Sequence, residues 1–170
     1  DAAASFEAIQ KLEAPGFEQI FENQELRREF ENLTRKLDVP GENLPKVVYR
    51  LIDPEQYVSQ RVLVVGGGDS ALEAAASIAE AGCREVALSY RGDSFSRAKP
   101  RNRERVAGLH KSGRLQVLLN SNVRRIDPEC VVVEQQGKDV ELANDAVIVS
   151  AGGILPTDFL KKIGIDVETK

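Results

Sequence analysis

Three small residues at fixed spacing carry the clearest chemical signal in this chain of 170 residues. Gly66, Gly68 and Ala71 follow directly after an apolar run at 62–65. The first glycine permits a tight turn out of a strand, the second lets a phosphate approach the backbone, and the alanine lets a helix pack closely on the strand. The first N–H groups of that helix then face the phosphate, and the helix dipole favours its charge. The turn predicted to hold a dinucleotide comprises Gly66, Gly67, Gly68, Asp69, Ser70 and Ala71.

The alternative interpretation of this turn is a glycine-rich connection that binds no ligand. Asp69 stands where the N-cap of the helix is expected, and aspartate suits that position. Because a carboxylate would repel a phosphate, Asp69 is expected to point away from the ligand and to act structurally. No catalytic residue is predicted in or near the turn.

The end of the next predicted strand indicates which dinucleotide binds. NAD-specific turns place an Asp or Glu about twenty residues after the glycines, where it binds the ribose hydroxyls. Here the strand ends in Tyr90 and Arg91, with no acid. The guanidinium groups of Arg91 and Arg97 offer paired donors for a 2′-phosphate, with Lys99 as a further candidate. This pattern favours NADPH, leaves NADH possible, and competes with the simpler interpretation of a solvated basic surface.

The elements that must position these residues alternate in a regular order. Apolar and helical periodicity predicts strand 61–66, helix 69–81 ending at Gly82, strand 85–90, helix 101–111 and strand 115–120. Three short runs then predict an antiparallel meander, and a last apolar run predicts a strand; these runs are 123–126, 130–135, 139–142 and 146–149. This order predicts the α/β class, as a Rossmann-like doubly wound parallel sheet with a small antiparallel β-meander.

Three regions are expected along the chain. Residues 1–36 are predicted to be an acidic helical appendage, because residues 1–33 carry eight acids and three bases and show helical apolar spacing. Residues 37–60 are predicted to be a linker interrupted by prolines, and residues 61–170 an NAD(P)H-binding domain. The appendage is a candidate surface for contact with a partner, through residues 1–33.

Composition excludes several other classes. The net charge of −4 argues against a general nucleic-acid or membrane-surface binder, and no apolar run is long enough to span a membrane. The two cysteines form no CxxC pair and no metal cluster, and so few cysteines suit a reducing compartment such as the cytoplasm. Because the chain begins with Asp1 and contains no methionine, we expect a processed, excised or engineered piece of a longer product.

Four stretches together resemble the NADPH-binding domain of the thioredoxin-reductase-like flavoproteins, which belong to the pyridine nucleotide–disulfide oxidoreductases. The resemblance covers residues 34–170, about four-fifths of the chain. The stretches that carry it are the glycine turn and helix at 66–75, the 2′-phosphate segment at 89–98, the glycine-proline turn at 150–156 and the crossover at 35–42. It adds Gly152 and Gly153 to the predicted cofactor-binding residues.

Departures from that family pattern narrow what the resemblance implies. The redox Cys-x-x-Cys pair is absent from 49–53, and Gly92 replaces the second arginine of the 2′-phosphate segment. The chain is therefore more similar to the branch that contains ferredoxin–NADP reductases of the thioredoxin-reductase type and bacillithiol-disulfide-reductase-like proteins. The glycine turn of the family's flavin domain and its later Gly-Asp segment are also absent. The resemblance thus implies that this chain binds a nicotinamide cofactor, with FAD held only in the parent protein.

Three functions remain open at this point. The first is a module that positions NADPH for hydride transfer to a flavin, held by an FAD-binding domain of the same or another chain; such a module is not expected to be catalytic alone. The second is a self-contained NAD(P)-dependent dehydrogenase, which needs a proton-transfer residue and a substrate pocket. The third is a non-catalytic assembly domain that keeps the fold and binds nothing.

Overall fold

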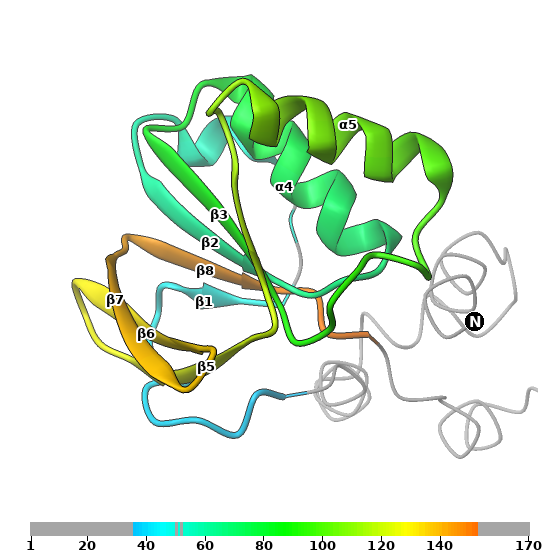
Figure 1. The fold of residues 1–170 in the computed structure, drawn as a ribbon. Helices are drawn as coiled ribbons and strands as arrows, with labels where there is room; N and C mark the ends of the chain where they lie inside the picture. Colours follow the sequence, from blue (N-terminus) through cyan, green and yellow to red (C-terminus); the bar gives the residue numbers. More distant parts are fainter. Residues whose placement is uncertain (1–35, 50, 52, 153–170) are drawn as a thin grey trace, which may run out of the picture. The chain divides into compact units, whose positions relative to one another are not determined.

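The structure, a computed structural model, describes residues 36–49, 51 and 53–152 (Figure 1). Residues 36–151 form one compact unit. The predicted helical appendage at 1–36 lies outside the described residues, apart from Lys36. The division of the chain at residue 36 and the extension of the nucleotide domain to residue 170 therefore stay predictions.

A parallel sheet of five strands forms the centre of the described unit, in the order β1-β8-β2-β3-β4. Its strands are β1 (Val47–Val48), β2 (Arg61–Val65), β3 (Glu85–Tyr90), β4 (Gln116–Leu119) and β8 (Ala146–Val149). β8 and β2 are buried on both faces, as their continuous apolar sequences predict for parallel strands covered on both sides.

Two helices cover one face of this sheet, α4 (Asp69–Ala81) and α5 (Pro100–Lys111) (Figure 1). α4 turns small residues and two larger ones, Leu72 and Ile78, toward Val62, Val64 and Leu88 of the sheet. Truncating a fully buried leucine of this kind to alanine typically costs about 2–5 kcal/mol. The alanines of α4 allow close approach to β2, which brings the start of the helix next to the end of that strand.

An antiparallel sheet covers the opposite face of the parallel sheet (Figure 1). It consists of β5 (Ser121–Ile126), β6 (Cys130–Gln135) and β7 (Lys138–Ala143), with a bulge in β5 between Val123 and Arg125. Val131 and Val133 of β6 pack with Leu63 and Val147 of the parallel sheet. Alternate residues of β2 and β8 thus face two separate cores.

The segment predicted as a linker carries two short elements and belongs to the same compact unit. β1 pairs in parallel with β8, and a 3-10 helix, η1 (Pro54–Tyr57), precedes β2. Gly41, with a φ of +85°, lies so close to β5 that a Cβ there would be 1.7 Å from the carbonyl oxygen of Ile126. In this sequence Pro40-Gly41 marks a tight packing contact, a role that composition does not distinguish from a flexible connection.

Glu42 organises the same segment. Its carboxylate accepts hydrogen bonds from the N–H groups of Leu37 and Asp38 and from the hydroxyl of Tyr49. Burial opposes the ionised form, but these hydrogen bonds outweigh burial and lower the pKa of Glu42. These hydrogen bonds therefore fix the conformation of the crossover segment that precedes β1.

The predicted α/β class, with a parallel sheet and an antiparallel meander, is confirmed. The bounds of four predicted elements, 69–81, 85–90, 130–135 and 146–149, are those observed. The other bounds differ by at most two residues; the second helix begins at Pro100, and the first meander strand begins at Ser121. Within residues 36–152, helices cover one face of the parallel sheet only, and the meander covers the other.

Candidate functional site

The site begins at the turn between β2 and α4, where Gly66 has a φ of +148°. A Cβ at Gly66 would lie 2.3 Å from the carbonyl oxygen of Ser150 and 2.9 Å from the Cβ of Ala71. The N–H of Gly66 donates to the carbonyl oxygen of Ser89 at 3.0 Å. Three segments therefore meet at this glycine, and any side chain would separate them.

Gly68 differs from Gly66 in its surroundings. It is the N-cap of α4, and apart from its chain neighbours no atom of the described residues lies within 4 Å of the place where its Cβ would be. The N–H groups of Asp69, Ser70 and Ala71 follow in the first helical turn, where helix geometry provides no intrahelical partner. An open backbone position followed by such N–H donors fits the pyrophosphate of a dinucleotide.

Asp69 is not the N-cap of α4, which corrects the sequence-based expectation. The N-cap is Gly68, which has no side chain to form a capping hydrogen bond, and Asp69 is the first residue of the helix. The Asp69 carboxylate instead accepts from the backbone N–H of Lys99 and the amide of Asn102, each at 2.8 Å. Burial opposes ionisation, but these two hydrogen bonds outweigh it and lower the pKa of Asp69. The carboxylate thus joins the starts of α4 and α5.

The segment between β3 and α5 is attached to the glycine turn at both of its ends. At one end, the ring of Tyr90 lies against Gly67 and Gly92. At the other end, the N–H of Lys99 donates to Asp69. The segment that carries the predicted 2′-phosphate residues therefore lies beside the turn predicted to hold the pyrophosphate.

The side chains of Arg91 and Arg97 are exposed. Within the described part of the chain, neither forms an ion pair or a side-chain hydrogen bond with another residue. Arg105, by contrast, pairs with Glu80 between the two helices. The described residues thus leave the donors of Arg91 and Arg97 unpaired, whereas the guanidinium of Arg105 is already paired with Glu80.

Two residues of this region, Phe95 and Asn102, were missed by sequence reasoning. Phe95 stacks on Tyr90 with ring centroids 5.6 Å apart and an interplanar angle of 22°. The buried Asn102 bridges Asp69 and Glu73, donating to Glu73 Oε1 at 2.8 Å. A lone Asn on the inner face of an amphipathic helix was the available signal, since a buried amide needs partners.

The two glycines predicted after the last strand are only partly described. Gly152 is exposed and has a φ of +93°, a conformation that suits glycine. Gly153 lies outside the described residues. The roles of both in cofactor binding stay predictions.

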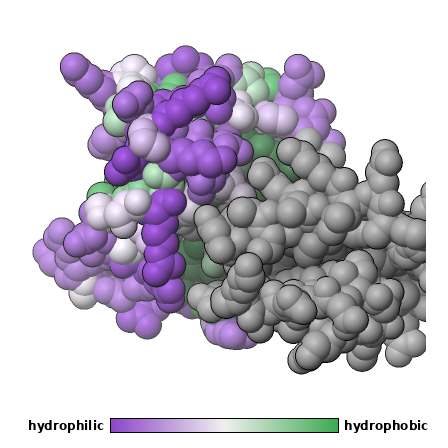
Figure 2. All heavy atoms as spheres, turned by 90° about the vertical axis from the view of Figure 1, so that its right-hand side faces the viewer, coloured by the Kyte–Doolittle hydropathy of each residue, from purple (hydrophilic) through white to green (hydrophobic). Residues whose placement is uncertain are grey.

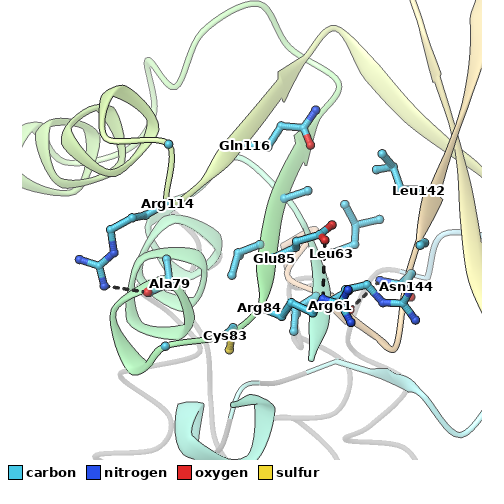
Figure 3. A pocket seen from close by; sticks show the side chains of 16 residues that line it. Arg61, Leu63, Ala79, Cys83, Arg84, Glu85, Arg114, Gln116, Leu142 and Asn144 are labelled. Carbon is cyan, nitrogen blue, oxygen red and sulfur yellow. Dashed lines mark hydrogen bonds and ion pairs between the residues drawn. The ribbon is translucent and has the colours of Figure 1, made fainter. Parts of the chain in front are cut away.

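A hollow of about 450 Å³ lies at the opposite edge of the sheet, where β2 and β3 begin (Figure 3). Arg61, Arg84, Arg114 and Asn144 contribute to its lining. Arg114 donates to the carbonyl oxygen of Ala79, and Arg61 pairs with Asp145. Ligands of open α/β sheets bind at the carboxyl ends of the strands, so this hollow at the amino ends is not the dinucleotide site.

The described surface gives no sign of other classes of site. Val58 is the one large hydrophobic side chain left exposed among the described residues, and hydrophilic side chains make up most of the described surface seen in Figure 2. Within the same residues, no His, Cys, Asp and Glu side chains cluster to hold a metal ion. No helix in the described part is long and apolar enough to cross a membrane.

Comparison with known proteins gives one consistent result. The model of the family described as pyridine nucleotide-disulphide oxidoreductase matches residues 30–170. A ferredoxin–NADP reductase of Ignicoccus hospitalis is 32% identical over 143 residues, which cover 80% of this chain and 45% of that protein.

Solved structures agree with the sequence matches. The bacillithiol disulfide reductase Bdr of Staphylococcus aureus superposes with a TM-score of 0.72 at 31% identity, covering 82% of this chain and 43% of that one. A thioredoxin reductase of Lactococcus lactis gives a TM-score of 0.65 at 26% identity, covering 79% of this chain and 46% of that one. The chain therefore spans less than half of the length of each of these three proteins.

Proposed function

Because this chain belongs to the pyridine nucleotide-disulphide oxidoreductase family, we propose that it binds NADPH at the β2–α4 turn and positions it for a flavin held elsewhere. The open backbone at Gly68 is the observation that carries this proposal, since it leaves space where a pyrophosphate must approach. The nicotinamide would supply the hydride, while the protein supplies binding, orientation and electrostatics.

Arg91 and Arg97 support the preference for NADPH over NADH. Both guanidinium groups are exposed, and in the described structure neither is engaged by a carboxylate. A 2′-phosphate can therefore take their donors without breaking an existing ion pair. Bidentate guanidinium–phosphate hydrogen bonds are among the stronger polar contacts in proteins.

We propose that FAD is bound outside the described residues, by an FAD-binding domain of the same or another chain. In that arrangement residues 1–33 are a possible contact with the partner, and neither nucleic acid nor a membrane is a partner. A reducing, cytoplasmic compartment belongs to the same proposal, which the two free cysteines, Cys83 and Cys130, support.

Calorimetric titration of the full chain with NADPH and NADH tests the proposal. We expect both to bind, NADPH more tightly, and we expect no oxidation of NADPH until a flavoprotein acceptor is added. Absence of binding by either nucleotide would leave only the assembly-domain interpretation. Turnover of a substrate without added flavoprotein would instead favour a self-contained dehydrogenase.

A further inference from the structure

The Asp69 carboxylate lies between the two helices, and both of its hydrogen-bond donors belong to the start of α5. A single oxygen, Oδ1, accepts from the backbone N–H of Lys99 and from the side-chain amide of Asn102, each at 2.8 Å. Asp69 itself is half-buried and is the first residue of α4. Its backbone therefore belongs to the glycine turn, while its side chain contacts the neighbouring helix.

The start of α5 is completed by this contact. Its N-cap residue, Lys99, makes no side-chain capping hydrogen bond, and its third residue is Asn102. In a capping box the third residue accepts a hydrogen bond from the N–H of the N-cap residue. Here Asp69, thirty positions earlier in the chain, accepts from that N–H, and Asn102 donates to Asp69 as well. A carboxylate is also favoured at the positive end of a helix.

The segment that carries the two candidate arginines ends at the same contact. Arg91 begins the segment between β3 and α5, and Arg97 stands two residues before Lys99. Both side chains are exposed, and no ion pair or side-chain hydrogen bond within the described residues holds either of them. The backbone of the segment therefore decides where the two guanidinium groups lie.

We propose that Asp69 is a positioning residue: its carboxylate fixes residues 91–98 relative to the glycine turn and thereby sets the preference for NADPH over NADH. This inference rests on the proposed NADPH-binding function and adds a residue that acts through Arg91 and Arg97. One ribose carries both the pyrophosphate and the 2′-phosphate of NADPH, so the two phosphate sites must keep a fixed separation. NADH lacks the second phosphate, so its binding does not depend on that separation.

Charge alone predicts the opposite effect. A carboxylate near two phosphate sites repels both, so its removal would tighten the binding of NADPH, which has the additional phosphate, more than that of NADH. A positioning role predicts weaker NADPH binding when the acceptor is lost. Asp69→Asn separates the two roles, because the amide loses the charge but keeps an oxygen that can accept from Lys99 and Asn102.

Calorimetric titration of the full chain with NADPH and NADH gives the ratio of the two affinities. We expect Asp69→Ala to lower this ratio by about fivefold through weaker NADPH binding, and Asp69→Asn to rescue it. Glu80→Ala is the matched control, because it removes a carboxylate of α4 that accepts from Arg105 of α5. Glu80→Ala should lower the urea midpoint and leave the ratio unchanged, as a merely structural contact would.

An unchanged ratio in Asp69→Ala overturns the proposal. Equal changes in the two Asp69 variants, in either direction, would trace the effect to charge and overturn it too. If Asp69→Ala does not fold, Asn102→Ala removes one of the two donors and should lower the ratio in the same direction; an unchanged ratio there is equally decisive against the proposal.

Arg91→Ala distinguishes failure of this inference from failure of the proposed function. If Arg91→Ala lowers the ratio and Asp69→Ala does not, only the positioning role is refuted. If Arg91→Ala leaves the ratio unchanged, or if the unaltered chain binds neither nucleotide, the proposed NADPH site itself is wrong, and the role of Asp69 in selectivity is refuted with it.

Discussion

The two ends of β2 use similar residues for different purposes. At the amino end, the guanidinium of Arg61 donates to both carboxylate oxygens of Asp145, at 2.9 Å and 2.6 Å, and its backbone N–H donates to the same carboxylate at 2.8 Å. At the carboxyl end, Gly68 is open and Arg91 is exposed beside the turn. At the amino end the charged donors are paired within the protein, whereas at the carboxyl end Arg91 has no ion-pair partner among the described residues.

A hollow is not by itself evidence of the dinucleotide site. The hollow of about 450 Å³ lies at the amino end, where its arginines include the paired Arg61. The donors of the glycine turn are backbone N–H groups. Available donors, rather than enclosed volume, therefore distinguish the candidate site in this fold.

The largest expected effect is on the fold. Gly66→Val should destabilise the chain by about 2–4 kcal/mol, because a side chain at a φ of +148° would collide with Ser150 and Ala71. Urea unfolding measures the loss. Gly68→Val, with open space and an extended backbone, should cost less than about 1 kcal/mol, as an N-cap change. Equal losses would show that the two glycines do not differ as described.

Gly68→Val should instead abolish binding of both nucleotides, since the new side chain occupies the approach of the pyrophosphate. Calorimetric titration with NADPH and NADH measures this. Gly108→Ala is a matched control: this glycine of α5 also has open space at its Cβ position and lies on the exposed side of the helix. The control should bind as the unaltered chain does, and retained affinity in Gly68→Val would argue against the whole site.

Arg91→Ala should weaken NADPH by about tenfold and NADH little, because it removes a charge-assisted hydrogen bond to the 2′-phosphate alone. The affinity ratio of the two nucleotides is the measurement. Arg84→Ala removes an exposed arginine at the amino end of β3 and should leave both affinities unchanged. Equal weakening of NADPH and NADH by Arg91→Ala would contradict the assigned role.

The smallest effect concerns the amino end of β2, where Arg61 pairs with Asp145, and it depends on pH. Hydrogen bonds from the side chain and backbone of Arg61 hold the pKa of Asp145 well below its usual range. Because the folded-state pKa is depressed, the pair stabilises the fold above the ordinary aspartate pKa of about 4, and this contribution is lost as pH falls below it.

Asp145→Asn should therefore lower the urea midpoint at pH 7 and flatten its decline between about pH 4 and pH 2. Arg61→Gln should have a similar effect, and the double variant should lose less than the sum of the two single losses. An acid profile identical to that of the unaltered chain would show that the ion pair contributes nothing measurable. Nucleotide binding at pH 7 should be unaffected by either variant.

Sequence reasoning predicted the parallel sheet, the meander and the turn because these depend on local patterns. The apolar run at 62–65, followed by glycines, is typical of a strand buried on both faces, and Gly66-x-Gly68-x-x-Ala71 indicates which positions must have little or no side chain. It assigned residues 37–60 to a linker because a Pro-Gly pair such as Pro40-Gly41 occurs both in tightly packed turns and in flexible connections. It misplaced Asp69 as an N-cap because the competing partners, Lys99 and Asn102, lie 30 and 33 residues away in the sequence.

The amino-acid sequence by itself thus determined where the chain turns and which residue types could meet a phosphate. The tertiary structure decided which of them remain available. Tyr90 covers Gly67 and leaves Gly68 open, and Asp145 takes the donors of Arg61. Such contacts join residues far apart along the chain, so they depend on how packing brings the elements together. The sequence shows which positions are glycine, whereas the residues packed around each glycine decide whether a ligand can approach it.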